Sequence, residues 1–250
     1  MKILPVPCLS DNYAYVLVDE TANVAAVIDP VESTKVLAAA RETGMELAAV
    51  LTTHHHADHS GGNDGVAAAV PGIAVYGGDE RIPAVTTKVK DGDKFALGSL
   101  DVRAIKTCGH TSGSICYYVE DRANDQRAVF TGDTLFVGGC GRLFEGSPAD
   151  MHDSLNVKLA ALPDDTLVFA GHEYTSANLR FALSVDADNQ ALQTKAQRCA
   201  EARCTMPSTI AEEKDTNPFM RVTQPALQRA ANATDPVEAL RVIRQMKDRF

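Results

Sequence analysis

Residues 47–59 of the chain read LAAVLTTHHHADH. The first seven form a short apolar run of the kind that predicts a buried strand, and the rest carry His54, His56, Asp58 and His59. The turn-forming stretch 60–63, SGGN, follows and indicates the start of a helix. Imidazole and carboxylate are ligands that suit Zn²⁺, Fe and Mn. The stretch therefore predicts a metal site in a strand-to-helix loop, where layered α/β proteins place functional groups.

The alternative interpretations of this cluster are histidines that are simply hydrogen-bonded in a surface loop, and a closed structural zinc site. Such sites usually recruit cysteines in closely spaced pairs. The six cysteines of this chain include no C-x-x-C pair, so we favour a functional site over a structural one.

Three further strand ends carry a metal-ligating residue. His110 follows the alternating run 100–105, Asp133 follows the apolar run 129–131, and His172 closes the run 167–170. Each one alone is a weak signal, because a single Asp or His after a strand is usually a turn or hydrogen-bonding residue. Together with the first loop they make five histidines and two aspartates. That number exceeds the needs of one tetrahedral ion and suits two metals that share a bridging carboxylate and a bridging water.

The motifs T-H-x-H-x-D-H, G-H-T, G-D-T and G-H-E, in this order, resemble the metallo-β-lactamase superfamily. Three more segments resemble glyoxalase II, the hydroxyacylglutathione hydrolases: residues 11–13 (DNY), 132–146 (GDTLFVGGCGRLFEG) and 217–221 (NPFMR). The similarity covers essentially the whole chain.

This resemblance implies an α+β fold, a four-layer αβ/βα sandwich with a C-terminal helical domain. It places a catalytic domain at residues 1–173 and a helical substrate-binding domain at 174–250. It also implies two divalent metal ions, with zinc expected and Fe or Mn acceptable to the same ligands. By resemblance the ligands are His54, His56 and His110 for one ion, Asp58, His59 and His172 for the other, and Asp133 as the bridge. His55 and His152 keep no metal role; we expect His55 to support the site or the fold and His152 to pack or face solvent.

The chain also has candidate substrate contacts. Asp235 and Pro236 begin a strong helix, on which Arg241, Arg244 and Lys247 recur every three residues. Periodicity alone favours a solvated basic face opposite the apolar side chains Leu240, Ile243 and Met246. The resemblance instead implies that Arg244 and Lys247 bind glutathione carboxylates, and it adds Arg142, Phe144, His172 and Tyr174 as substrate contacts. Some family members have Lys at position 142 and Tyr at position 144, so this chain keeps the charge but lacks a hydroxyl there.

The reaction that the resemblance implies is hydrolysis of S-(2-hydroxyacyl)glutathione, typically S-D-lactoylglutathione, as the second step of methylglyoxal detoxification. A metal-bridged hydroxide would attack the thioester carbonyl, with Asp58 and Asp133 as the catalytic carboxylates. The rivals are a glutathione persulfide dioxygenase, which uses a single iron, another thioesterase of the same fold, a β-lactamase, a nuclease, and a non-catalytic binding relative. The complete ligand set favours two metals over the single-iron dioxygenase and argues against a binding relative, which would be expected to have lost ligands. A two-zinc β-lactamase would commonly have Cys in place of Asp, and a nuclease would need a basic surface.

Composition restricts the partners. The 250 residues carry a formal net charge of −9 and a pI near 5.2, which argues against nucleic-acid binding. No 18-residue apolar span and no secretory or transit pattern is visible, and the scattered cysteines suit free thiols in a reducing compartment. We therefore expect a cytoplasmic monomer whose partner is a small-molecule glutathione thioester, without nucleic acid or membrane.

Strand patterns dominate the chain up to residue 172, with helices predicted at 35–41 and from Ser147. Helical periodicity replaces them afterwards, at 174–185, 189–202 and 236–247. This change of pattern is the residue-level basis for a separate helical region.

Overall fold

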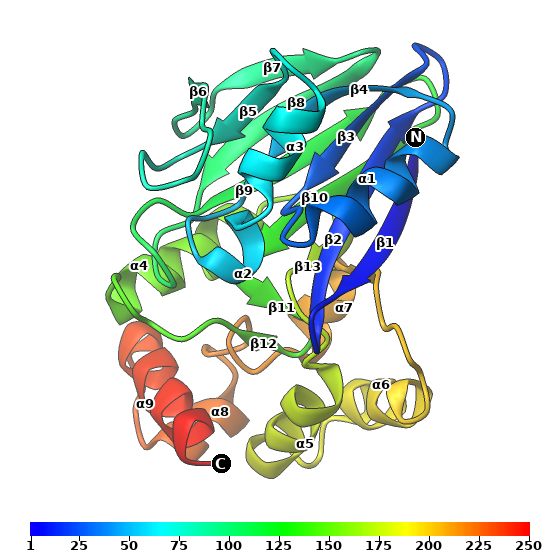
Figure 1. Ribbon diagram of the computed structural model, residues 1–250. Helices are drawn as coiled ribbons and strands as arrows, with labels where there is room; N and C mark the ends of the chain where they lie inside the picture. The colour runs from blue at the N-terminus through cyan, green and yellow to red at the C-terminus, as the bar shows by residue number, and fades with distance from the viewer. The chain divides into compact units, whose positions relative to one another are not determined.

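The computed structural model describes the whole chain, residues 1–250. The chain forms two compact units, coloured along the sequence in Figure 1. Unit 1 comprises Met1–Lys106 and Gly113–Gly132, and unit 2 comprises Thr107–Ser112 and Asp133–Phe250.

Unit 1 contains a six-stranded mixed sheet with the order β1-β2-β3-β4-β5-β6. The strands are β1 (Lys2–Cys8), β2 (Asn12–Asp19), β3 (Val24–Ile28), β4 (Glu46–Leu51), β5 (Ala74–Gly77) and β6 (Thr87–Lys88). The pairs β1–β2 and β2–β3 are antiparallel, and the remaining pairs are parallel. β1 contains Pro5 and Pro7, which a strand tolerates at the edge of a sheet. These prolines are the reason why sequence patterns did not predict β1.

Helices cover one face of this sheet (Figure 1). They are α1 (Ser33–Glu42), α2 (Ala57–Ser60) and α3 (Asn63–Ala69). α1 buries Val36, Leu37 and Ala40, an amphipathic spacing that faces the sheet. Val36 and Val66 pack with strand residues such as Val27 in one apolar cluster. The loop after β4 is therefore held between a buried strand and the short helix α2.

Unit 1 also contains an antiparallel run of four strands. They are β7 (Lys94–Leu97), β8 (Leu100–Lys106), β9 (Ile115–Asp121) and β10 (Gln126–Gly132), paired in chain order. The two sets of strands face each other within the unit, since the Tyr15 and Phe130 rings lie 5.4 Å apart and Tyr76 stacks on Phe95 at 4.2 Å. The buried Tyr117 hydroxyl donates a hydrogen bond to the Thr52 carbonyl at 3.0 Å. The packing of the two sheets therefore reaches the loop that carries His54.

Unit 2 contains two short strand pairs and most of the helices. The pairs are β11 (Leu135–Phe136) with β12 (Gly139–Cys140), and β13 (Leu167–Ala170) with β14 (Ser208–Thr209). The helices are α4 (Pro148–His152), the π-helix η1 (Asp153–Leu159), α5 (Thr175–Val185), α6 (Gln190–Cys199), α7 (Ile210–Thr216), α8 (Pro225–Ala231) and α9 (Pro236–Arg249). α4 begins with a complete capping box between Ser147 and Asp150, and the Asp235 side chain caps α9 by accepting a hydrogen bond from the Glu238 N–H at 2.9 Å. Both of these predicted helix starts are confirmed.

Several predicted details differ from the structure. The predictions missed β1, the two-residue strands β6, β11, β12 and β14, and the helices α2, α7 and α8. These two-residue strands are too short to show a period of two in sequence. Because α2 begins at Ala57, Asp58 and His59 lie in a helix and not in the predicted loop. On α9, Met246 is 36 % exposed, whereas Arg244 is only 6 % exposed, so the predicted division into a basic face and an apolar face is wrong at these two positions. All six cysteines are free, and no helix has the length and apolarity needed to cross a membrane.

Candidate metal centre and substrate site

Four predicted ligands lie together in unit 1: His54 and His56 in the loop after β4, and Asp58 and His59 on the short helix α2. His54 Nε2 lies 3.1 Å from His56 Nδ1, and the rings of His54 and His59 are 4.3 Å apart. Asp58 Oδ2 lies 3.6 Å from His59 Nε2, and its side chain is 44 % exposed while that of His59 is 1 % exposed. This segment therefore gathers imidazole and carboxylate groups. The Asp58 side chain is more accessible to solvent than that of His59.

Buried polar groups orient these ligands. Asp29, which follows β3, is 2 % exposed. Its Oδ2 lies 3.1 Å from His59 Nδ1 and accepts the Thr53 hydroxyl at 2.6 Å, while its Oδ1 accepts the Thr53 N–H at 2.8 Å. A proton on His59 Nδ1 leaves the Nε2 lone pair for a metal. Asn12 Nδ2 donates to the Asp58 carbonyl at 2.9 Å and to its Oδ2 at 3.1 Å. Asp29 was not among the predicted site residues, because its role depends on pairing of β3 with β4.

We expect Asp29→Asn to weaken metal binding by about 10- to 100-fold, the usual effect of losing an outer partner of a metal-binding histidine. Asn tolerates the left-handed backbone of this position, where φ is +48°. It has only one acceptor oxygen, however, so it cannot serve His59 Nδ1 and both Thr53 donors. Competition with a chromogenic chelator measures the effect.

Asp19→Asn is the matched control. Asp19 is also buried at 2 % exposure, but its Oδ1 accepts backbone N–H groups of Thr21 and Ala22 in a turn. This control is expected to lower stability and keep metal affinity. Equal affinities for Asp29→Asn and Asp19→Asn would contradict the orienting role of Asp29.

The other three predicted ligands lie together in unit 2. Asp133 Oδ2 lies 3.4 Å from His110 Nε2 and 3.4 Å from His172 Nε2. All three residues are at most 9 % exposed. His110 Nδ1 lies 2.9 Å from the Arg142 carbonyl oxygen, which fixes a proton on Nδ1 and leaves Nε2 toward Asp133.

These spacings fit a shared cation. Two ligand atoms that each lie about 2.1 Å from one tetrahedral zinc ion are roughly 3.4 Å apart. The distances from Asp133 Oδ2 to the two imidazoles match that value, and they are long for direct hydrogen bonds. The donor set and its spacing therefore suit a divalent metal with Asp133 as a shared ligand.

The segment after β12 passes so close to Asp133 that position 141 requires a glycine. A Cβ at Gly141 would lie 2.0 Å from the Asp133 carbonyl oxygen and 3.0 Å from His110 Nδ1. No side chain fits there, so Gly141 lets the segment after β12 pass directly beside the ligands.

Two aromatic residues of the predicted substrate site contact ligand histidines. The Tyr174 ring stacks on His172 at 4.5 Å with an interplanar angle of 7°, and Tyr174 is 37 % exposed. The Phe144 ring meets His110 edge-on at 5.2 Å and is 62 % exposed. These rings place exposed apolar surface next to His110 and His172.

The predicted basic residues have different surroundings. Arg244 is buried: Nη1 donates to the Cys140 carbonyl at 2.7 Å, Nη2 pairs with Asp248 at 3.1 Å, and the guanidinium lies over the Phe219 ring at 5.2 Å. Arg142 is exposed and lies 3.6 Å from the same Asp248 carboxylate. Arg244 therefore supports the fold as well as carrying a charge.

Lys247 is half-buried and donates one hydrogen bond, to the Ala177 carbonyl at 3.3 Å. Burial lowers the pKa of Lys247 from its ordinary value, and repulsion from nearby guanidinium groups adds to the effect. These groups belong to Arg244, Arg180 and Arg142, against a single opposing carboxylate, Asp248. The excess of positive charge suits an anionic ligand.

Arg180 is the member of this basic cluster that sequence reasoning missed. It lies on α5, is exposed, and forms no hydrogen bond or ion pair of its own. No sequence signal links α5 with α9, because the Lys247–Ala177 bond that joins them spans 70 residues.

The two remaining histidines lie outside both ligand clusters. His55 Nδ1 is 3.8 Å from Asp79 Oδ2, and His152 is the last residue of α4, partly exposed. Both positions agree with the roles expected for them.

Comparison with known families covers the chain in two adjoining parts. Residues 10–172 match the model of the metallo-beta-lactamase superfamily, and residues 173–250 match the model described as hydroxyacylglutathione hydrolase C-terminus. ETHE1 from Myxococcus xanthus has a similar structure, with a TM-score of 0.72 and 28 % identity over 98 % of this chain and 91 % of that one. The protein thus has the metallo-β-lactamase fold, an α+β sandwich with a C-terminal helical region, and its His/Asp clusters fit a binuclear metal site.

Two relatives are similar over their full length. The cytoplasmic hydroxyacylglutathione hydrolase of Arabidopsis thaliana is 47 % identical over 100 % of this chain and 99 % of its own. The hydroxyacylglutathione hydrolase of a Synechococcus strain is also 47 % identical, over 100 % of both chains. Within the superfamily, the chain belongs to the hydroxyacylglutathione hydrolase, or glyoxalase II, family.

Proposed function

We propose that this protein hydrolyses S-(2-hydroxyacyl)glutathione thioesters, typically S-D-lactoylglutathione, to glutathione and a 2-hydroxy acid such as D-lactate. This is the second step of methylglyoxal detoxification. Family membership over the whole chain supports the substrate class. The observation that carries the reaction type is the Asp133 carboxylate, which lies 3.4 Å from both His110 and His172.

The proposed metal ligands are the seven side chains of the family motifs. His54, His56 and His110 are assigned to one ion, Asp58, His59 and His172 to the other, and Asp133 to both. Zinc is the metal that we propose, and Fe or Mn would suit the same donors. Two such cations, when bound, lower the pKa of a water toward neutrality and stabilise negative charge on a carbonyl oxygen.

The side chains of the protein supply orientation. Asn12 holds the accessible Asp58 carboxylate, which we assign to orienting the nucleophilic water. Asp29 and the Arg142 carbonyl keep the imidazoles of His59 and His110 in a single tautomer. The leaving group is a thiolate, whose conjugate acid has a pKa of about 8.5, so its departure needs little help from a general acid.

We assign the glutathione moiety to the basic cluster of unit 2. Lys247 and Arg244 are proposed to attract its carboxylates, with Arg142 beside them. Tyr174, Phe144 and His172 are proposed to contact the substrate nearer the reacting thioester, which agrees with the exposed rings next to His172 and His110.

The domain boundary and cellular setting are also proposals. We place a catalytic domain at residues 1–173 and a substrate-binding helical domain at 174–250, which agrees with the ranges of the two family models. We propose a cytoplasmic monomer, with no nucleic acid or membrane as partner; the name of the Arabidopsis relative supports the compartment.

Elemental analysis of purified protein, combined with a thioester assay, tests the proposed function. We expect two metals per chain and release of free thiol from S-D-lactoylglutathione without oxygen consumption. A single firmly bound metal with full thioesterase turnover would refute the dinuclear assignment. Oxygen consumption with glutathione persulfide, and no thioester hydrolysis, would establish the dioxygenase alternative instead.

A further inference from the structure

The β11–β12 hairpin begins two residues after Asp133, and side chains of the C-terminal helices hold its backbone. Asn178 of α5 donates to the Val137 carbonyl at 3.1 Å. Asn217, which follows α7, donates to the carbonyls of Phe136 at 3.1 Å and Gly139 at 2.9 Å. A hairpin held this way cannot shift without breaking buried hydrogen bonds.

Glu213 of α7 accepts a backbone donor of the hairpin, the Gly138 N–H. Its side chain is fully buried, at 0 % exposure. Glu213 Oε2 accepts the Gly138 N–H at 2.8 Å and the Asn217 side-chain amide at 2.9 Å. Glu213 Oε2 therefore accepts a hydrogen bond from the hairpin itself. It also orients Asn217, whose side chain donates to two hairpin carbonyls.

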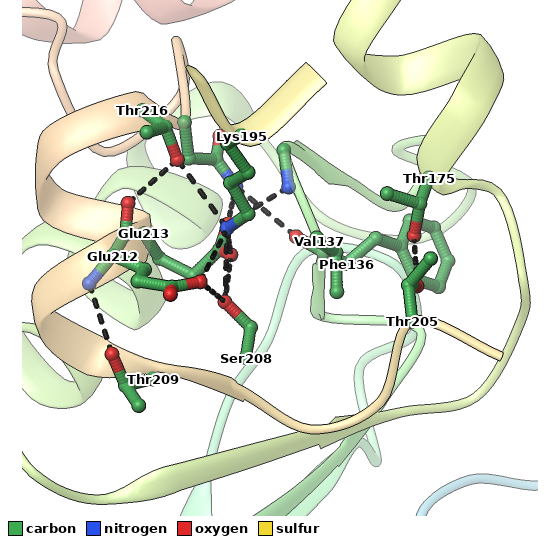
Figure 2. A network of polar contacts seen from close by, with 12 residues as sticks. Phe136, Val137, Thr175, Lys195, Thr205, Ser208, Thr209, Glu212, Glu213 and Thr216 are labelled. Atoms are coloured by element: carbon green, nitrogen blue, oxygen red, sulfur yellow. Dashed lines mark hydrogen bonds and ion pairs between the residues drawn. The ribbon is translucent and has the colours of Figure 1, made fainter. Parts of the chain in front are cut away.

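The other oxygen of Glu213 faces a buried cation. Figure 2 shows Lys195 of α6 reaching Glu213 and Ser208 beside the backbone of Phe136 and Val137. Lys195 Nζ lies 2.5 Å from Glu213 Oε1 and 2.9 Å from Ser208 Oγ, and Ser208 donates to Glu213 Oε1 at 2.5 Å. Lys195 is only 4 % exposed. The buried lysine is thus one of four donors that the Glu213 carboxylate accepts, together with Ser208, Asn217 and the Gly138 N–H.

Stability alone is a weak reason for this arrangement. Burying two ions costs desolvation, and apolar replacements of buried ion pairs are often neutral or stabilising. The carboxylate does something that an apolar pair cannot do: it presents two oxygens to donors on opposite sides, the hairpin on one and α6 on the other. This points to a role in placing the hairpin.

The hairpin in turn contacts the ligands. The Phe136 ring meets His172 edge-on at 6.0 Å and Tyr174 at 5.2 Å. Gly141, just after the hairpin, lies against the Asp133 carbonyl and the His110 ring. A displaced hairpin would therefore move Asp133 and disturb its spacing from His110 and His172.

We propose that Glu213, paired with Lys195, is a positioning residue that places Asp133 for metal binding through the β11–β12 hairpin. The inference rests on the proposed metal role of Asp133 and adds a determinant that lies outside the ligand set.

The first test compares Glu213→Gln with Glu212→Gln. Glutamine has one acceptor oxygen, so its NH₂ group must face either Lys195 or the two hairpin-side donors. We expect Glu213→Gln to lower metal affinity, measured by chelator competition, by about 10- to 100-fold. Glu212 is the adjacent residue of the same helix. It pairs with Arg198 at 2.8 Å and lies 3.4 Å from Lys195, but no hydrogen bond joins it to the hairpin. Glu212→Gln therefore removes a charge beside Lys195 without changing the hairpin contacts, and is expected to bind metal like the parent.

The second test is rescue by the double variant Lys195→Met with Glu213→Gln. Without the ammonium, the amide oxygen can face Gly138 while its NH₂ donates to Ser208, so metal affinity is expected to return to within about threefold of the parent. If Glu213→Gln alone does not fold, the metal affinity of the double variant still tests the positioning role.

The outcomes separate this inference from the proposed function. A parent protein without two metals and thioesterase activity refutes the proposed function. A parent with both, together with unchanged metal affinity in Glu213→Gln or with no recovery in the folded double variant, overturns only the positioning role.

Discussion

Replacing Asp133 with alanine is expected to lower kcat for S-D-lactoylglutathione by at least about a hundredfold and to remove at least one metal per chain. The reason is that Asp133 Oδ2 lies 3.4 Å from both His110 and His172, so its loss removes the ligand that we propose both metals share. Loss of an outer partner alone typically costs 10- to 100-fold, and a bridging ligand contributes more. Elemental analysis and steady-state kinetics on the same preparation measure both effects.

Asp186→Ala is the matched control for this variant. Asp186 is a buried aspartate of the same unit, at 5 % exposure, and pairs with Arg221 at 3.3 Å. Its replacement is expected to reduce thermal stability and leave the metal content at two. If Asp133→Ala keeps two metals and parental turnover, the bridging assignment is wrong.

Neutralising Lys247 is expected to raise KM for the glutathione thioester by about 10- to 150-fold, which corresponds to roughly 1.5–3 kcal/mol for a charged hydrogen bond. We expect much less change in kcat, because contacts far from the reacting bond act equally on ground and transition states. Arg244→Ala is expected to raise KM similarly and also to lower stability, because Arg244 donates to the buried Cys140 carbonyl. Steady-state kinetics with a short thioester that lacks the glutathionyl carboxylates should show parental KM for both variants.

Arg241→Ala provides the control on the same helix. Arg241 pairs with Glu238, with Nε 2.7 Å from the carboxylate, and the guanidinium groups that lower the pKa of Lys247 are those of Arg244, Arg180 and Arg142. The KM of Arg241→Ala for the glutathione thioester is expected to equal that of the parent. An unchanged KM in both Lys247→Ala and Arg244→Ala would refute the proposed binding of glutathione by these residues and leave Arg244 with its role in the fold alone.

Local sequence patterns predicted much of the fold. Runs of apolar and β-branched residues predicted β4, β8, β10 and β13 near their observed bounds, because strand periodicity is a property of neighbouring residues. The starts of α4 and α9 were predictable for the same reason, since capping requires only Ser147 or Asp235 and the next three residues. β1 was missed because its two prolines are acceptable only at a sheet edge, and edge position is a property of the whole sheet.

The candidate site, like the fold, has some features that are local in the sequence and others that depend on tertiary packing. By itself, the sequence determined the chemistry of the ligands and their placement after strands: the segment from His54 to His59, and His110, Asp133 and His172. Residue type and distance from a strand end are local, so a single chain shows them. Only the tertiary structure decided which groups orient those ligands and which charges are buried. Asp29 meets His59 across 30 positions, Glu213 meets Gly138 across 75, and Arg244 meets Cys140 across 104. Contacts at such separations depend on how strands and helices pack, and burial then sets whether a charge is a solvated surface group or a partner in a hydrogen-bonded network.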